Sequence, residues 1–127
     1  MTQAFTLSVL GETFAVSKLE RGTHVPFWAT SADWWSVTTT SDELFVCPEN
    51  KVPIDITSNR GWKCLKVIGP LPFSLTGVLF SLLKPLAEAR ISVFTLSTFD
   101  TDYLLVKTQS LAATVNVLSL AGHRILV

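Results

Sequence analysis

The chain has 127 residues, of which 48% are hydrophobic and 16% charged, and its ten basic and ten acidic residues give a formal net charge of zero. Such a composition excludes a disordered chain, which is poor in apolar residues, and argues against a nucleic-acid partner, which requires a basic surface. No apolar stretch approaches the roughly 20 residues of a membrane span, and no secretory signal opens the chain, so we expect a cytoplasmic protein with no membrane partner.

Alternating apolar residues predict two strands near the start of the chain, over Phe5 to Leu10 and Phe14 to Leu19. A turn at Gly11-Glu12 would join them as a hairpin. Pro26 to Ala29 predicts a single helical turn with a proline near its beginning.

Two further β-rich segments, Ser36 to Thr40 and Leu44 to Cys47, flank the turn-like Ser41-Asp42 and predict a second hairpin. The segment from Pro48 to Gly61 has the composition of a loop and is the best candidate for a domain boundary.

The second half begins with a predicted strand over Trp62 to Ile68, which ends at Gly69-Pro70. Ser74 is a good N-cap for a helix whose apolar residues continue to Leu86 at helical spacing. Pro85 should kink that helix or tilt its last turn.

Two more strands, Ile91 to Leu96 and Tyr103 to Lys107, surround the turn-rich Ser97 to Asp102. A second helix from Leu111 to Leu120 would end at Gly122, and Arg124 to Val127 would form the last strand. The order β-α-β-β-α-β predicts an α+β, ferredoxin-like domain, with two helices on one face of an antiparallel four-stranded sheet.

A weak internal repeat indicates two such units in tandem. Ser36 to Val46 resembles Ser92 to Val106, each reading as strand, turn and strand. The first unit, residues 1–60, is degenerate because the segment between Pro48 and Trp62 is too short for both a helix and a strand. The complete unit would occupy residues 61–127, and the extra strand at Phe5 to Leu10 would take the position of the strand that the first unit lacks.

Four runs of the second half form a distinctive pattern: Gly61 to Val67, Gly69 to Gly77, Pro85 to Ala89 and Ser97 to Tyr103. They resemble a family of small proteins that carry two ACT domains in tandem. Related ACT pairs occur in aspartate kinases and in the cytosolic arginine sensor of animals, and they bind amino acids at domain or subunit interfaces. The resemblance therefore implies regulatory ligand binding.

The first candidate binding segment joins a strand to a helix, where free backbone N–H groups and the helix dipole favour a carboxylate. The alternative is a loop shaped only for folding. Gly77 would let a ligand approach the backbone closely. The segment consists of Leu71, Pro72, Phe73, Ser74, Leu75, Thr76 and Gly77.

The second candidate segment is a predicted hairpin turn with two acidic residues. Its carboxylates could hold an ammonium or guanidinium group, although Asp is also simply a good turn former. A ligand would then bridge two units, with its carboxylate on the first segment and its other end on the second. The segment consists of Ser97, Thr98, Phe99, Asp100, Thr101 and Asp102.

Four aromatic residues, Phe27, Trp28, Trp34 and Trp35, cluster in the first unit. They could anchor a partner or stack on a planar ligand, but they more often replace a missing helix in a thin core. Cys47 and Cys64 lack the spacing of a zinc site and are expected to be buried and reduced.

No sequence motif provides a catalytic nucleophile, a metal site or a cofactor site, so we do not expect an enzyme. The preferred hypothesis is a sensor of an amino acid or a similar small metabolite that acts through ligand-coupled association. It would be a homodimer, because few charges protect its apolar strands, and it could control a protein partner. The alternative is an ACT-fold structural or interaction module that binds no ligand.

Overall fold

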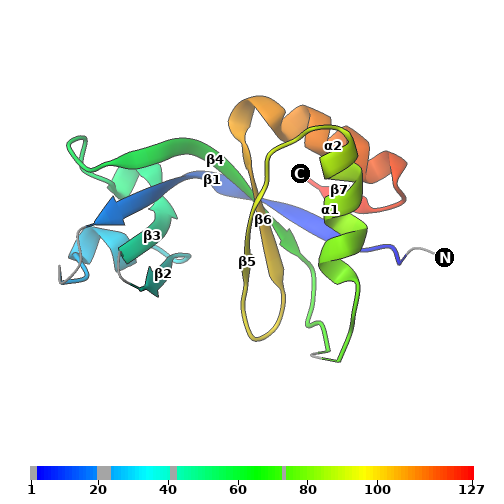
Figure 1. Cartoon of the computed structure of the whole chain (residues 1–127), viewed down its shortest axis with the longest axis horizontal. Coiled ribbons are helices and arrows are strands. Elements are labelled where there is room, and N and C mark those ends of the chain that lie inside the picture. The colour runs from blue at the N-terminus through cyan, green and yellow to red at the C-terminus, as the bar shows by residue number, and fades with distance from the viewer. Residues whose placement is uncertain (1–2, 20–23, 41–42, 73) are drawn as a thin grey trace. The chain divides into compact units, whose positions relative to one another are not determined.

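The computed structural model describes residues 3–19, 24–40, 43–72 and 74–127 (Figure 1). The chain forms two compact units: a larger unit of Met1–Gly11 with Lys63–Val127, and a smaller unit of Glu12–Trp62. Strands β1 (Thr6–Leu19) and β4 (Ser58–Val67) each contribute residues to both units.

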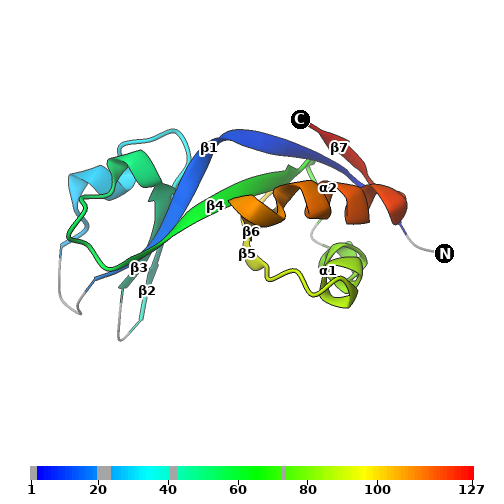
Figure 2. The same ribbon diagram turned by 90° about the horizontal axis from the view of Figure 1, so that it is seen from above.

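The larger unit has the predicted β-α-β-β-α-β order. After β4 come α1 (Val78–Glu88), β5 (Phe94–Ser97), β6 (Asp102–Lys107), the single 3-10 turn η3 (Thr108–Ser110), α2 (Leu111–Leu120) and β7 (Arg124–Leu126). Both helices supply side chains to one core with the sheet, and they lie next to each other (Figure 2). The ferredoxin-like arrangement with two helices on one face is confirmed.

The sheet of the larger unit contains one strand more than predicted, in the order β7-β1-β4-β6-β5. The beginning of β1 lies between β7 and β4, where it pairs in parallel with β7 through Thr6 and Arg124. It runs antiparallel to β4, and the Ile68 N–H donates to the Thr6 carbonyl oxygen at 2.8 Å. A strand distant in sequence is thus inserted into the sheet of the unit.

The predicted hairpin at Gly11-Glu12 is wrong, because β1 is one continuous strand of 14 residues. Both halves of β1 have pairing partners: Thr6 to Ser8 with β7, and Phe14 to Leu19 with strand β3 of the smaller unit. Pairing on both halves overrides the weak local turn signal. The two compact units therefore differ from the predicted units, residues 1–60 and 61–127, because the first eleven residues group with the C-terminal unit.

The core of the larger unit follows from the alternation of residues along its strands. Leu65 and Val67 of β4 point to the helices, as do Leu104 and Val106 of β6, and all four side chains are fully buried. Burial of each such side chain stabilises the fold by about 1.5–3 kcal/mol. The helices complete this core with Val78, Leu82, Leu86 and Leu118.

The smaller unit is built from strands and two short 3-10 turns, in the strand order β2-β3-β1-β4. The predicted hairpin of β2 (Ser36–Thr39) and β3 (Glu43–Pro48) is confirmed, while its turn at residues 41–42 lies outside the described residues. The predicted helical turn is also present, as η1 (Phe27–Thr30). The second 3-10 turn, η2 (Glu49–Lys51), lies in the predicted loop, which ends early because β4 begins at Ser58.

Aromatic contacts fill the core of the smaller unit, whose described residues include no α-helix. Trp34 meets the ring of Phe14 edge-on at 5.1 Å, and Trp28 lies 6.2 Å from the ring of Phe45. Both phenylalanines are fully buried. Trp28 and Trp34 therefore pack in the core, as the core-filling interpretation of the aromatic cluster predicts, whereas Phe27 is 85% exposed.

Helix α1 differs from its prediction at its beginning. It starts at Val78, and its N-cap is Gly77 with φ +78°, whereas Ser74 is exposed and precedes the helix. The prediction of Ser74 as the N-cap is wrong because the chain makes another hydrogen bond before the helix begins, in which the Leu75 N–H donates to the Pro72 carbonyl oxygen at 2.9 Å.

Pro85 lies inside α1 and has no N–H, so the carbonyl oxygen of Ser81 lacks its usual helical donor. His123 replaces that donor. The Phe5 N–H donates to His123 Nδ1 at 3.0 Å, which leaves the ring proton on Nε2, 3.2 Å from the Ser81 oxygen. The buried His123 side chain thus links the start of the chain to α1.

None of the helices in the described residues is long and apolar enough to cross a membrane.

Candidate functional site

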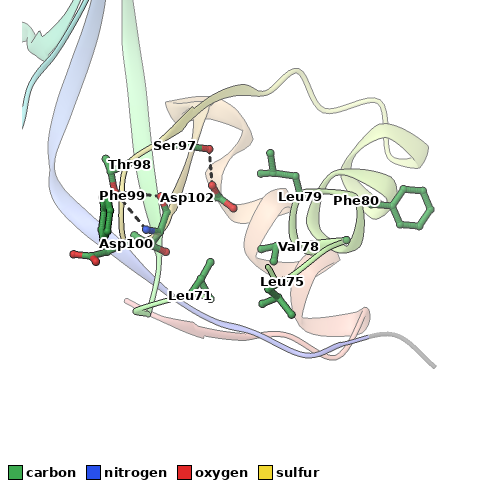
Figure 3. A pocket seen from close by; sticks show the side chains of 12 residues that line it. Leu71, Leu75, Val78, Leu79, Phe80, Ser97, Thr98, Phe99, Asp100 and Asp102 are labelled. Atoms are coloured by element: carbon green, nitrogen blue, oxygen red, sulfur yellow. Dashed lines mark hydrogen bonds between the residues drawn. The ribbon is translucent and has the colours of Figure 1, made fainter. Parts of the chain in front are cut away.

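A pocket of about 430 Å³ lies between the beginning of α1 and the β5–β6 hairpin of the larger unit (Figure 3). It brings together the two segments that the sequence singled out, which are separated by 19 residues in the chain. Both segments belong to the larger unit, so the prediction that the ligand bridges two units is not met by this pocket. The lining residues are Leu71, Leu75, Gly77, Val78, Leu79, Phe80, Ser97, Thr98, Phe99, Asp100, Thr101 and Asp102.

The hairpin contributes all six of its predicted residues, whereas the first segment contributes only three of seven. Pro72, Ser74 and Thr76 do not line the pocket, and Phe73 lies outside the described residues. In their place the first turn of α1 takes part, through Val78, Leu79 and Phe80. These three residues lie outside the predicted segment, because the predicted N-cap was Ser74 and the helix begins later, at Val78.

The beginning of α1 provides hydrogen-bond donors in the pocket wall. The first helical bond in this turn runs from the Ser81 N–H to the Gly77 carbonyl oxygen at 2.9 Å, so the preceding N–H groups have no acceptor within the helix. No side chain caps them, and the first turn contains no acidic residue. This end of the helix carries about half a positive charge and attracts an anion.

Hydrogen bonds hold the opposite wall of the pocket, the β5–β6 hairpin, in one conformation. The Thr98 N–H donates to the Thr101 carbonyl oxygen at 2.8 Å, and the buried Thr101 hydroxyl donates to the Val67 carbonyl oxygen at 2.6 Å. The Leu71 N–H donates to the Asp100 carbonyl oxygen at 2.7 Å, which ties the first segment to the hairpin. These bonds pre-organise both walls of the pocket.

The two carboxylates of the hairpin point in different directions. Asp102 lies on the side of the hairpin that faces Leu79 and accepts a hydrogen bond from the Ser97 hydroxyl at 2.5 Å (Figure 3). Asp100 points away from α1. The pocket therefore presents one carboxylate, that of Asp102, to a group bound near the helix.

Apolar side chains occupy the rest of the wall. Leu75 and Leu79 are half-buried, while Phe80 and Phe99 are 66% and 78% exposed at the edge of the pocket. A pocket with apolar walls and a few convergent polar groups is typical of sites for small molecules.

The cysteines and His123 of the described residues have structural surroundings. No group of three or more potential metal ligands occurs among them. Burial raises the pKa of the Cys47 thiol to about 11, against a smaller lowering by Arg60, and the pKa of the Cys64 thiol to about 12. Both nitrogens of His123 are used in the fold.

The sequence also matches known families along most of its length. The ACT domain family matches residues 57–119, and a family of N-terminal domains matches residues 12–55. The chain belongs to the ACT-domain family, and the tandem arrangement with a degenerate first unit is consistent with these two matches.

Individual proteins are also similar to this chain. The protein Atu0741 from Agobacterium tumefaciens is 36% identical, with a TM-score of 0.92 over 98% of this chain and 93% of that one. The cytosolic arginine sensor for mTORC1 subunit 1 from Homo sapiens is 35% identical over 75 residues, and the same values hold for Bos taurus. This match covers 55% of the chain but only 23% of the length of the sensor.

More distant structures share the fold alone. The regulatory subunit of aspartate kinase from Thermus thermophilus superposes with a TM-score of 0.64 at 10% identity, over 94% of this chain and 99% of that one.

Proposed function

We propose that the chain is a non-enzymatic regulatory sensor that binds an amino acid in the pocket between α1 and the β5–β6 hairpin. The single observation that carries this proposal is the pairing of opposite electrostatic ends in one pocket. The uncapped N–H groups of α1 form one end, and the Asp102 carboxylate forms the other.

The ligand's carboxylate binds at the first turn of α1, where it accepts hydrogen bonds from backbone N–H groups. Its ammonium group, or a cationic side chain, binds Asp102 through charge-assisted hydrogen bonds. Leu75 and Leu79 contact its apolar part. A volume of about 430 Å³ accommodates a metabolite of this size.

Ligand binding in this pocket changes the association of the protein with a second protein surface. The exposed rings of Phe80 and Phe99 lie at the edge of the pocket, so a second protein surface that covers them would also meet the ligand. We propose a cytoplasmic homodimer in which the ligand stabilises one arrangement of the subunits, and a regulated protein partner that recognises it. The name of the arginine sensor, a relative of partial length, makes a cationic amino acid the first to test.

Isothermal titration with each of the twenty amino acids tests binding. We expect at least one to bind, and Asp102→Asn to weaken it about tenfold, since a charge-assisted hydrogen bond is lost. Asp55→Asn, an exposed position of the smaller unit, is the matched control and should leave the affinity unchanged. If none of the twenty binds, or if both variants bind equally well, the proposal is wrong.

Light scattering with and without the bound amino acid tests association. We expect the mass of a dimer, in an amount that depends on the ligand. A monomer of about 14 kDa at high micromolar concentration under both conditions would contradict the coupling.

The alternative function is an interaction module without a ligand, and exposed apolar side chains of the smaller unit favour it. Phe27 is 85% exposed and Ile54 is 99% exposed. This alternative predicts a protein complex whose stability does not change when amino acids are added. Phe27→Ser with Ile54→Ser would then weaken the complex, whereas Asp102→Asn would not.

A further inference from the structure

A second pocket, of about 340 Å³, lies on the other side of the β5–β6 hairpin from the first. Leu65 and Val67 point into the helix-covered core, so Lys66 and Ile68, the alternate residues of β4, lie on the opposite face of the sheet. Both line the second pocket. Thr98, Asp100 and Thr101 line both pockets and form the wall between them.

Two opposite charges face this pocket without neutralising each other. Lys66 is half-buried on β4, and the Asp100 side chain, which points away from α1, is exposed on the hairpin (Figure 3). Within the part of the chain that the structure describes, neither side chain forms an ion pair or a hydrogen bond. A partly desolvated ammonium group with no counter-charge gains most from a ligand that carries an anion.

The wall between the pockets is fixed by close packing. A Cβ atom added at Gly69 would lie 3.0 Å from the Leu71 nitrogen and 3.1 Å from the Asp100 carbonyl oxygen. The hydrogen bonds of Leu71 with Asp100 and of Thr101 with Val67 hold the same residues. The backbone of Asp100 therefore keeps one position relative to β4, the strand that carries Lys66.

We propose that the second pocket is a separate binding site for a small zwitterion. The anionic group of the ligand binds Lys66 Nζ, its cationic group binds the Asp100 carboxylate, and its carbon chain contacts Ile68 and the ring of Tyr103. The volume, at the lower end for ligand pockets, suits a ligand of a few carbon atoms. This site exists whether or not the first pocket binds an amino acid.

The test is an NMR titration of the full chain with β-alanine, followed by its two halves, propionate and propylamine. We expect β-alanine to shift the backbone amide signals of Lys66, Ile68 and Tyr103. Each half should bind about tenfold or more weakly, because it meets only one of the two charges. Equal binding of β-alanine and propionate would contradict the assignment of a zwitterion.

Charge-removing variants locate the site. Lys66→Met and Asp100→Asn should each weaken β-alanine binding about tenfold or more, and both keep the shape of the side chain they replace. Lys51→Met and Asp55→Asn remove the same charges at exposed positions of the smaller unit and should have no effect. Unchanged binding by the Lys66 and Asp100 variants would overturn the proposal.

The Asp102→Asn variant distinguishes binding in the second pocket from binding in the first, because Asp102 lines only the first. In this variant the shifts of Lys66, Ile68 and Tyr103 should persist with the same affinity. If they disappear, or if β-alanine shifts only Leu75, Leu79 and Phe80, the ligand occupies the first pocket and the second site does not exist. Failure of the amino-acid titration for the first pocket leaves this result unaffected.

Discussion

Gly77, the N-cap of α1, adopts the left-handed conformation, and this conformation is the reason for a glycine at this position. A Cβ atom at Gly77 would meet no heavy atom within 4 Å, so close approach within the chain does not require the glycine. The conformation does, because φ is +78°. With Ser74 as the N-cap, Gly77 would lie in the first turn of the helix, whereas Gly77 is itself the N-cap.

We therefore expect Gly77→Ala to lower the free energy of unfolding by about 1–2 kcal/mol without a steric clash. Gly11→Ala is the matched control, since its Cβ also meets nothing within 4 Å and its φ is not positive. That substitution should stabilise β1 by about 0.5 kcal/mol. Urea denaturation measures both, and equal effects of the two variants would contradict the argument from φ.

The two cysteines should be unreactive in the folded protein. Burial disfavours the thiolate, and with pKa values of about 11 and 12 roughly one molecule in a thousand carries the Cys47 thiolate at about pH 8, and one in ten thousand that of Cys64. Iodoacetamide at this pH should modify neither cysteine in native protein and both in urea. Rapid modification of native Cys64 would show that β4 opens readily.

The same shifts make the fold sensitive to high pH. Burial raises the pKa of both thiols in the folded state. The contribution of these thiols to stability is therefore complete below the pKa of an unfolded thiol, about 8.5, and is lost as the pH rises towards 11 or 12. Between pH 7 and pH 10, the free energy of unfolding should fall less for Cys64→Ala than for the wild type. Parallel profiles would contradict this.

At the scale of elements, α1 tolerates a proline because another element supplies the missing donor. His123, directly before β7, donates to the Ser81 carbonyl oxygen and also accepts from the Phe5 N–H before β1. Its ring stacks on Phe5 at 5.8 Å. One buried side chain thus holds two ends of the larger unit and a helix together.

A double-mutant cycle tests this account. His123→Ala should lower the free energy of unfolding by about 3 kcal/mol, because two buried polar groups lose their partners. In a Pro85→Ala background the loss should be about 1 kcal/mol smaller, since residue 85 then donates to Ser81. Strictly additive effects would show that Ser81 is not the shared acceptor. His24→Ala, at an exposed position, is the control and should change little.

At the scale of the whole molecule, the larger unit depends on residues from the beginning of the chain. The first part of β1 lies between β7 and β4, so the segment 61–127 alone lacks an internal strand of its sheet. The fully buried Leu7 belongs to its core. Loss of an internal strand leaves two rows of backbone groups unpaired.

We expect a fragment of residues 61–127 to show no cooperative unfolding transition. A chain in which an Asn-Gly turn replaces Glu12–Trp62 should fold, because β1 and β4 run antiparallel and Lys63 Nζ donates to the Gly11 carbonyl oxygen at 3.3 Å. Thermal unfolding followed by circular dichroism compares the two. A cooperative transition of the fragment alone would contradict the need for β1.

The sequence by itself determined the features that depend on local patterns. The order of elements from β4 to β7 followed from periodicity, and Gly122 adopts the positive φ, +100°, that suits the residue after the end of a helix. The two segments that line the first pocket were also recognisable, since turn residues and a strand-to-helix loop are marked by local composition. Each of these signals lies within a few consecutive residues.

Only the tertiary structure decided the features that depend on pairing between distant residues. It made β1 a single strand and inserted it between β7 and β4, because hydrogen bonds to β3, β4 and β7 outweigh the preference of Gly11-Glu12 for a turn. It gave His123 the role of a helical donor, and it turned Asp102 towards α1 and Asp100 away. These outcomes arise from contacts between residues far apart in the chain, for which a single sequence carries no local signal.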